Sequence, residues 1–410
     1  MKLSIVAVVL IASFVVGINR FTVPESYDFR TNHPDWVPPI RNQGLCGSCW
    51  AFSTSYVYST RLYLSAKQQG APNVYKQIFS PQHQINCHRS QYLNGCSGGV
   101  IQDAFESIQE FGTTTDTCVP YKSSKDYFDV RRHKCTVTTC KRSTDPVKMY
   151  YGSRTIRVEV DDNNTAEDIA YLMKRQILTQ GPVSTSFRIG IDFLTFFKKN
   201  PKGIYKGSST KGRLGSHAIV TLGWGVENGV EYWICANSWG TSWGNQVTTL
   251  GYFKFKVLAP NGIEKGGFTA ISFDKPDSYI KPSPIAREDG SSKKKTTSGV
   301  VKIDSTSEEA KLAAAFAFES VKSKVPKVTS YTIQEIHSQP VEGFNFFVLL
   351  NVDARESKYN LFVSIHYSPD LVPTMTNFKF MAPSASQTCK SAVGTPLVGA
   401  ARCMVEVVNK

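Results

Sequence analysis

Several features that would define a special class of protein are missing from this sequence. Beyond residues 3–17 there is no long apolar run, which leaves nothing from which to build a bundle of membrane-spanning helices. No internal repeat occurs, so a solenoid is excluded. Acidic residues are few, 33 Asp and Glu against 47 Lys and Arg, and the net charge is +14. The basic residues are not interleaved with aromatic ones and form no known binding motif, so we expect no nucleic-acid partner.

The residues that are present indicate a globular chain of more than one domain. The 410 residues include 24 Phe, 18 Tyr and 6 Trp, and 41% of the chain is hydrophobic. Disordered chains are poor in aromatic residues, so disorder of the whole chain is excluded. At about 100–200 residues per domain, this length predicts two or three domains. We expect neither a cofactor nor a metal.

The N-terminus predicts export. Met1 and Lys2 precede an uncharged apolar run that ends near Gly17 and is short for a bilayer span. Residues 1–17 are therefore interpreted as a signal peptide, with an uncleaved signal anchor as the alternative. The predicted location is secreted or in a lysosome-like or vacuole-like compartment, with no membrane association after signal cleavage. In such an oxidising compartment cysteines can pair, and the one sequon, at residues 163–165, is compatible with this route.

The ten cysteines divide into two that stand apart and eight that could pair. Cys49 lies in the stretch 46–50, Cys-Gly-Ser-Cys-Trp, and Cys235 lies inside an apolar run that predicts a buried strand. The remaining eight are enough for four disulfides, but eight cysteines allow 105 pairings, so spacing alone cannot choose among them.

Composition separates two modules. Residues 21–274 mix helical and strand-like patterns, whereas residues 275–298 are rich in Pro and Ser, contain Lys293–Lys295 and have the composition of a basic linker. Residues 299–410 begin with a capping box at Ser305–Glu308 and an apolar helical stripe of Leu312, Phe316 and Val321. Strand-like segments follow at 328–336, 344–352, 359–367 and 374–381. One helix followed by several strands predicts an α+β domain.

Cys49 is placed like a nucleophile. A free thiol has a pKa of about 8.5 and must be activated, for instance by the N-terminus of a helix. The residues from Trp50 to Gln69 predict a largely buried helix that starts just after Cys49. Taken alone, Cys49 would be better explained as a disulfide or core cysteine.

Three segments in order favour catalysis. Residues 43–52, Gln-Gly-Leu-Cys-Gly-Ser-Cys-Trp-Ala-Phe, resemble the active-site motif of the papain-like cysteine proteases. Residues 215–219, Gly-Ser-His-Ala-Ile, resemble the family's catalytic histidine segment, and residues 237–240, Asn-Ser-Trp-Gly, its asparagine segment. The resemblance implies an α+β fold of two lobes, one helical and one like a β-barrel, and protein or peptide substrates.

The resemblance also implies roles for individual residues. Cys49 would be the thiolate nucleophile, His217 its ion-pair partner and general acid, and Asn237 the residue that orients the imidazole. Gln43 and the backbone N–H of Cys49 would form the oxyanion hole. Trp239 would shield the Asn–His hydrogen bond. Gly98 and Gly99 would bind the substrate backbone; the alternative is a tight turn beside a disulfide, and both interpretations can hold together.

The sequence of residues 223–229, Gly-Trp-Gly-Val-Glu-Asn-Gly, resembles the cathepsin B branch of the family. Three other features of the chain differ from that branch. Only His133 lies between Cys118 and Cys140, where cathepsin B carries adjacent histidines on an occluding loop, so we expect an open cleft and endopeptidase action. Gly266 replaces an expected acidic residue of the S2 wall, which argues against a preference for Arg at P2. Residues 245–250 look like an insertion. The disulfides implied by the resemblance are Cys46–Cys96, Cys87–Cys135 and Cys118–Cys140.

The second module resembles the cystatins, which inhibit this protease class. Gln339, Val341 and Gly343 fit the first-hairpin motif Q-x-V-x-G, and Cys389 and Cys403 enclose a stretch like the second hairpin, with Pro396 and Leu397 in place of Pro-Trp. The implied fold is one helix on an antiparallel sheet, and the implied partners are this chain's own cleft or other papain-like proteases. Little sequence separates the signal peptide from the protease-like start near Val23, which leaves no room for an inhibitory propeptide. Either the enzyme needs no such inhibition, or this module supplies it in place of a propeptide. The alternative is an inhibitor or interaction protein on an inactive protease scaffold.

Overall fold

The computed structural model describes most of both modules. The described residues are 22–70, 76–88, 93, 95–125, 135, 140, 147–207, 213–243, 250–260, 262–273, 280–282, 301–325, 328–354 and 357–381. The predicted signal peptide, most of the linker at 275–298, most of the insertion at 245–250, and Cys389, Pro396, Leu397 and Cys403 lie outside these ranges. Within them, no helix combines the length and the apolar character needed to cross a membrane.

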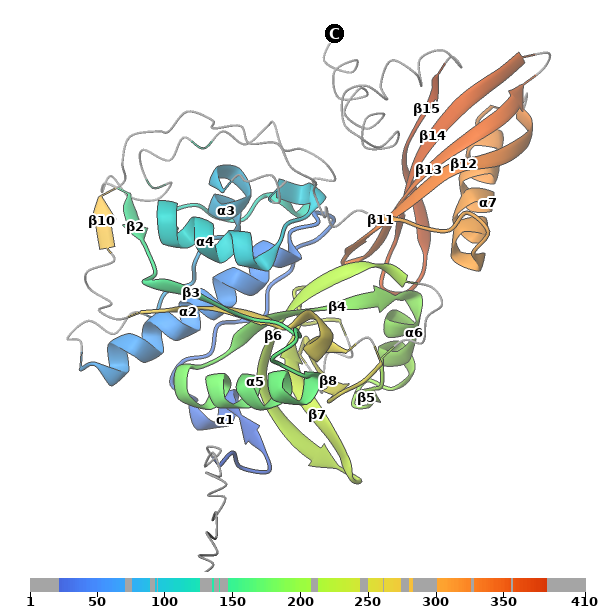
Figure 1. The fold of residues 1–410 in the computed structure, drawn as a ribbon. Helices are drawn as coiled ribbons and strands as arrows, with labels where there is room; N and C mark the ends of the chain where they lie inside the picture. The colour runs from blue at the N-terminus through green and yellow to red at the C-terminus, as the bar shows by residue number, and fades with distance from the viewer. Residues whose placement is uncertain are drawn as a thin grey trace, which may run out of the picture.

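A long buried helix forms the centre of the N-terminal part (Figure 1). This helix, α2, runs over Cys49–Gln68, and 17 of its 20 residues are buried, which is typical of a helix surrounded on all sides. It contacts α3 and α4 on one side and strands β6 and β9 on the other. The helices and 3₁₀ turns of this part are α1 (Phe29–Asn32), α2, α3 (Pro81–Cys87), η1 (Gly95–Ser97), α4 (Ile101–Phe111), η2 (Ser123–Lys125), α5 (Ala166–Gln180), α6 (Ile191–Lys199) and η3 (Ile263–Gly266).

An eight-stranded sheet packs against α2 in the order β3-β9-β4-β6-β7-β8-β5, with β1 paired to β6. All pairings are antiparallel except that of β5 with β8. Its strands are β1 (Tyr27–Asp28), β3 (Arg154–Val158), β4 (Val183–Gly190), β5 (Ile204–Tyr205), β6 (Arg213–Glu227), β7 (Val230–Ala236), β8 (Tyr252–Lys256) and β9 (Phe268–Ser272). Cys235 is fully buried on β7, as its apolar surroundings predicted.

The linker prediction needs one correction at its start. Residues Ile280–Pro282 form a strand, β10, that pairs antiparallel with β2 (Lys148–Tyr150). The Pro- and Ser-rich composition gave no sign of this strand, because an edge strand of three residues needs little apolar surface. Pro282 is tolerated because it lies at the end of the strand, where no interior hydrogen bond of the sheet is lost. The described part of this segment is therefore held by β2.

The C-terminal module, defined here as residues 301–381, is a five-stranded antiparallel sheet with one helix across it (Figure 1). The strand order is β11-β12-β13-β14-β15, and each of the four strands expected from the sequence is present with slightly wider bounds. The elements are β11 (Val301–Lys302), α7 (Glu308–Lys322), β12 (Val328–Val341), β13 (Gly343–Ala354), β14 (Ser357–Tyr367) and β15 (Pro373–Met381).

The start and buried face of α7 differ from the prediction. Ser307, not Ser305, is the N-cap, and its hydroxyl accepts a hydrogen bond from the N–H of Ala310. Leu312 is 63% exposed, so it does not belong to the buried stripe. Small residues fill that stripe together with Phe318 and Val321, because alanines let the helix lie close to the sheet. A search for large apolar residues misses such a face.

Candidate active site

The structure places Cys49 at the start of a helix, beside a pocket that is also lined by residues of the eight-stranded sheet. It is the first residue of α2, and the preceding Ser48 is buried with its hydroxyl against that of Tyr121 (3.1 Å). Because partial positive charge gathers at a helix N-terminus, this position favours a thiolate over a thiol. Cys49 makes no disulfide, and only 9% of its surface is exposed.

The imidazole of His217 on β6 is held in one tautomer by Asn237. His217 Nε2 lies 2.8 Å from Asn237 Oδ1, and the same oxygen accepts the backbone N–H of Ser238 at 2.8 Å. An amide oxygen only accepts, so Nε2 must carry the proton. The other nitrogen, Nδ1, is buried and has no hydrogen-bond partner in the described structure. His217 therefore keeps a free lone pair on Nδ1 for proton transfer.

Trp239 covers this pair from behind. Its ring lies 4.7 Å from the His217 ring at an interplanar angle of 30°, and both residues are fully buried. The indole ring against the imidazole keeps water from competing with His217 for the hydrogen bond to Asn237 Oδ1. Trp239 is not among the residues that line the pocket containing Cys49. In this structure Trp239 therefore contacts His217 and not the space that a substrate would occupy.

Gln43 is fixed in the same network. Its side-chain amide donates to the carbonyl of Cys46 (2.9 Å), and its side-chain oxygen accepts from the hydroxyl of Ser238 (2.6 Å). Tyr121 donates to the main-chain oxygen of Gln43 (2.6 Å). One of the two amide N–H groups is thus engaged by Cys46, and the second remains for another acceptor.

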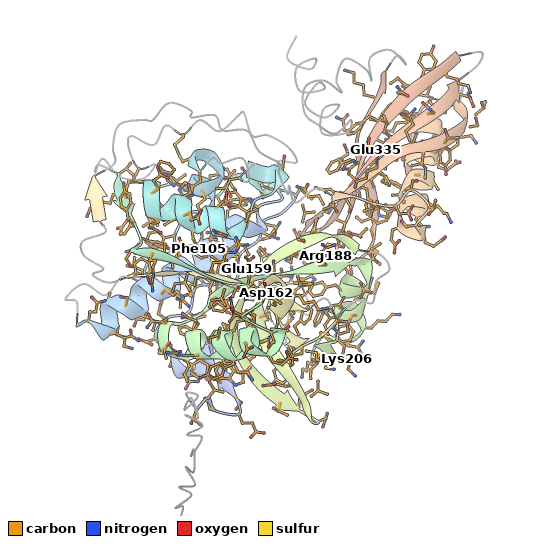
Figure 2. All side chains as sticks on the ribbon, in the orientation of Figure 1. Phe105, Glu159, Asp162, Arg188, Lys206 and Glu335 are labelled. Atoms are coloured by element: carbon orange, nitrogen blue, oxygen red, sulfur yellow. A yellow bond between two sulfur atoms is a disulfide. The ribbon has the colours of Figure 1, made fainter. Side chains whose placement is uncertain are left out.

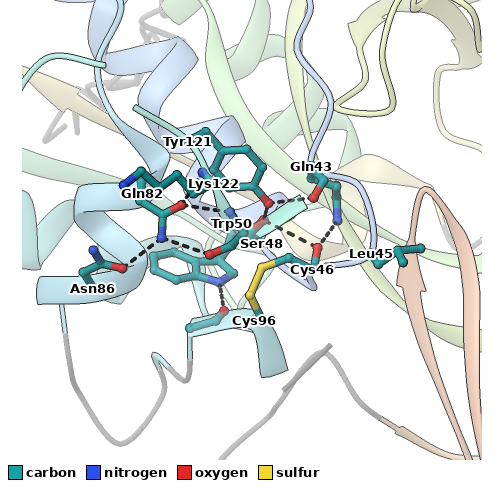
Figure 3. The surroundings of a disulfide bond; sticks show 12 residues. Gln43, Leu45, Cys46, Ser48, Trp50, Gln82, Asn86, Cys96, Tyr121 and Lys122 are labelled. Carbon is teal, nitrogen blue, oxygen red and sulfur yellow. Dashed lines mark hydrogen bonds between the residues drawn. A yellow bond between two sulfur atoms is a disulfide. The ribbon is translucent and has the colours of Figure 1, made fainter. Parts of the chain in front are cut away.

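The Cys46–Cys96 disulfide supports this corner of the site (Figure 3). Figure 3 shows Gln43 and Ser48 gathered at the Cys46 carbonyl, and the indole of Trp50 donating to the carbonyl of Gly95 (3.1 Å). The structure also contains the other two disulfides implied by the resemblance, Cys87–Cys135 and Cys118–Cys140. The loop before Cys49 is therefore anchored covalently and by buried hydrogen bonds.

A pocket of about 610 Å³ opens beside Cys49. Gly98 and Gly99 line it, and a β-carbon at Gly99 would come within 2.7–2.8 Å of the Trp50 ring, so only glycine fits there without movement. Further lining comes from Ser184, Ser186, Arg188, Ala218, Gly266 and Thr269. Val301 and Lys302 of the C-terminal module stand on the same wall.

The turn between β12 and β13 contacts the other side of the Cys49 loop. Gln339 donates to the carbonyl of Cys96 (2.7 Å), and Asn345 donates to that of Leu45 (3.2 Å). The backbone N–H of Glu342 donates to the Gly44 carbonyl (3.1 Å), and its carboxylate accepts from Asn42 (2.9 Å). Val341 and Gln339 are completely buried. This hairpin therefore lies against the residues that precede the nucleophile.

Two further contacts join the C-terminal module to the sheet of the N-terminal part. Ser338 donates to the Leu214 carbonyl on β6, and Lys198 on α6 lies 3.3 Å from the carboxylate of Asp370. Asp370 belongs to the turn between β14 and β15. The module thus reaches the site with β11 and the β12–β13 turn, and its β14–β15 turn contacts α6.

Burial controls the charges of the catalytic pair in this arrangement. It raises the pKa of the Cys49 thiol, although hydrogen bonding from the backbone of Ala218 works in the opposite direction. Burial also lowers the pKa of His217 to about 4, with a smaller opposing effect from the Asn237 hydrogen bond. Burial thus disfavours the charged forms of both groups, and the helix N-terminus at Cys49 acts in the opposite direction on the thiol.

The structure brings most of the expected site residues together. Cys49, Gly98 and Gly99 share one pocket, Gln43 and Cys49 flank one loop, and His217 and Asn237 share a hydrogen bond. Sequence reasoning missed Ser238, Tyr121 and Asn345. Ser238 was visible within the Asn-Ser-Trp-Gly segment, but nothing in the sequence marked Tyr121 or Asn345 as neighbours of the site. The β14–β15 turn was also missed, because the second hairpin was sought at Pro396 and Leu397.

Comparisons with known proteins agree with this geometry. Residues 23–268 match the model of the papain family cysteine proteases, and this chain belongs to that family. It is 33% identical over 257 residues to cathepsin B-like CP3 of Giardia intestinalis, an alignment covering 61% of this chain and 76% of the relative. It is 32% identical over 249 residues to cathepsin B-like cysteine proteinase 3 of Caenorhabditis elegans, covering 57% and 62%.

A solved structure shows the same branch. The procathepsin B S9 of Trypanosoma congolense superposes with a TM-score of 0.51 at 28% identity, covering 62% of this chain and 80% of the other. The expectation of a cathepsin B-like cysteine protease with an α+β papain-like fold is thereby confirmed. The C-terminal helix and five-stranded sheet lie beyond the matched family region.

Proposed function

We propose that this chain is a cysteine endopeptidase that acts through Cys49, His217, Asn237 and Gln43. The observation that carries the proposal is the His217–Asn237 hydrogen bond, which leaves Nδ1 of a buried imidazole unprotonated. Both sequence neighbours of His217, Ser216 and Ala218, line the pocket that contains the free thiol of Cys49. Transfer of the thiol proton to Nδ1 produces the thiolate and imidazolium pair that attacks a peptide bond. Three disulfides and the cathepsin relatives support passage through the secretory pathway, and we propose a secreted or lysosome-like location.

The reaction follows from these positions. The Cys49 thiolate adds to the carbonyl carbon, and the oxyanion is stabilised by the N–H of Cys49 and the second amide N–H of Gln43. The Nδ1 proton of His217 passes to the leaving amine, the C–N bond breaks, and a thioester remains on Cys49. Water then adds to the thioester while Nδ1 accepts its proton, the C–S bond breaks, and the acid product leaves. Asn237 holds the imidazole throughout.

Endopeptidase action is supported by the disulfide loop between Cys118 and Cys140. Its sequence contains a single histidine, His133, so the adjacent pair of an occluding loop is absent. A chain passing along Gly98 and Gly99 can then continue past Cys49 in both directions. Cleavage within a chain needs this freedom.

We further propose that residues 301–381 form a cystatin-like domain that restrains the protease in place of a propeptide. The Q-x-V-x-G motif occupies the β12–β13 turn, the part of the module that donates hydrogen bonds to Cys96 and Gly44. β11 enters the pocket wall beside Cys49, and Asp370 approaches α6. The contacts of β11 with the pocket and of the β12–β13 turn with the loop before Cys49 support occlusion of the cleft by the same chain.

The experiment compares the full chain with a chain that ends at residue 285. Faster hydrolysis of a fluorogenic peptide by the shorter chain is expected, and equal rates would overturn self-inhibition. A thiol-directed epoxide should label the shorter chain and fail to label its Cys49→Ala variant. Absence of labelling in a folded shorter chain would favour the inactive-scaffold alternative.

A further inference from the structure

The wall of the pocket beside Cys49 carries an unpaired positive charge. Arg188 lies on β4, opposite Ser216 of β6 and two residue pairs beyond the Ser186–Ala218 pair. Residues 184, 186 and 188 alternate along the strand, and all three line the pocket, so their side chains share one face. Arg188 is exposed, and no hydrogen bond or ion pair within the described residues engages its guanidinium.

The other charges of this wall are already matched. Arg157 and Glu159 pair with one another on β3 (Figure 2 labels Glu159 and Arg188). Lys302 pairs with Glu335 (3.3 Å), and both belong to the C-terminal module, so this cation leaves the pocket when the module leaves. Among the described residues that line the pocket, Arg188 is therefore the charged side chain that has no ionic partner and is available to a bound substrate.

The position that could carry an opposing carboxylate is a glycine in this chain. Gly266 lines the same pocket, and a β-carbon built on it would lie 3.1 Å from the backbone oxygen of Ser186 and 3.2 Å from its hydroxyl, so a side chain there would require Ser186 to shift by a few tenths of an ångström. The hydroxyls of Ser184 and Ser186 leave the pocket polar, but neither brings a negative charge.

We propose that Arg188 is a specificity-determining residue that selects an acidic side chain on the acyl side of the cleaved bond. An extended substrate that runs along Gly98 and Gly99 points alternate side chains to one face, and the guanidinium of Arg188 is among the groups that line the pocket such a side chain enters. A glutamate or aspartate there forms a charge-assisted hydrogen bond with the guanidinium, whereas arginine or lysine is repelled. This inference rests on the proposed peptidase function and names its substrate class.

The test uses the full chain with Gln339→Arg, a substitution chosen to open the cleft by displacing the C-terminal module. The Gln339 amide is packed so closely against Gly47 that it lies only 2.1 Å from where a β-carbon on Gly47 would be, so the longer arginine side chain cannot fit there. Peptides that differ only by Glu, Gln, Leu or Arg at the second or third residue before the scissile bond are compared by kcat/KM. We expect Glu to exceed Arg by about five- to tenfold at one of these positions, and the ratio to shrink at high salt.

Variants of the pocket charge then decide the cause. Arg188→Gln should bring the Glu-to-Arg ratio close to one, and Arg188→Glu should invert it. The matched control is Arg175→Glu, which reverses an exposed arginine on α5 outside the pocket and should leave the ratio unchanged. An unchanged ratio in Arg188→Glu, or an original preference for Arg, overturns the inference while hydrolysis of the Leu peptide still upholds the peptidase. If no peptide is cleaved and Cys49 resists epoxide labelling, the proposed function fails and this inference fails with it.

Discussion

The hydrogen bonds of Gln339 allow the docking of the C-terminal module to be weakened by a defined amount. Gln339→Ala removes the bond to the Cys96 carbonyl (2.7 Å), which joins the module to the N-terminal part. The bond that Asn345 donates to the Gln339 side-chain oxygen (3.2 Å) lies within the module and does not contribute to docking. One such bond contributes about 0.5–1.5 kcal/mol, and the buried carbonyl left without its partner adds to the loss. A total of about 1–2 kcal/mol raises the open fraction roughly 5- to 30-fold.

The open fraction can be read from the alkylation rate of Cys49 by iodoacetamide, followed by mass spectrometry. Cys235 is a second free thiol, fully buried on β7, and its modification reports unfolding instead of opening. We expect Gln339→Ala to accelerate labelling of Cys49 and to leave Cys235 unmodified. The matched control is Gln334→Ala, an exposed glutamine on the same strand. Equal Cys49 labelling in the two variants, or parallel labelling of Cys235, would refute the reasoning.

Three further predictions concern the catalytic pair, the disulfide and acid stability. In a chain opened by Gln339→Arg, Asn237→Ala should lower kcat about tenfold or more with little change in KM, because the imidazole of His217 loses its fixed tautomer. Steady-state kinetics measure both constants, and an unchanged kcat contradicts this prediction. Replacing Cys46 and Cys96 together by alanine should lower stability by about 2–4 kcal/mol, since this bond closes a loop of 50 residues; denaturant unfolding measures it, and an unchanged midpoint contradicts it. Burial lowers the pKa of His83 to about 3 and that of His88 to about 4, so the unfolded chain binds more protons between about pH 6.5 and 4; the Tm should fall as the pH is lowered through this range, and a constant Tm contradicts the assignment.

Much of the N-terminal part could be predicted because its chemistry is concentrated in short segments. The residues around Cys49, His217 and Asn237 carry their own local structure, since a helix start, a strand and a turn each follow from neighbouring residues. The alternating apolar residues of β12, β13 and β14 likewise predicted the sheet of the C-terminal module. In all these cases the pattern and the structure it forms lie within one stretch of chain.

Features that depend on distant neighbours escaped the sequence. The exposed Leu312 and the buried alanines of α7 depend on how closely the helix approaches its sheet. The strand β10 exists because β2 offers it free hydrogen-bonding groups. Asn345 becomes important only because folding brings it beside Leu45, 300 residues earlier in the chain. Such relations arise from tertiary contacts, which no local pattern encodes.

The position of the β12–β13 turn also has a consequence for the timing of activity. The turn and the loop that it contacts belong to one polypeptide, so every molecule is synthesised with one copy of each, and dilution cannot change this ratio. If the module restrains the protease as proposed, opening is a first-order event whose half-time does not depend on the protein concentration. The proposed restraint then holds the same active fraction in concentrated and in dilute protein, until cleavage of the connecting chain makes the association bimolecular. After such a cut, dilution alone would activate the protease.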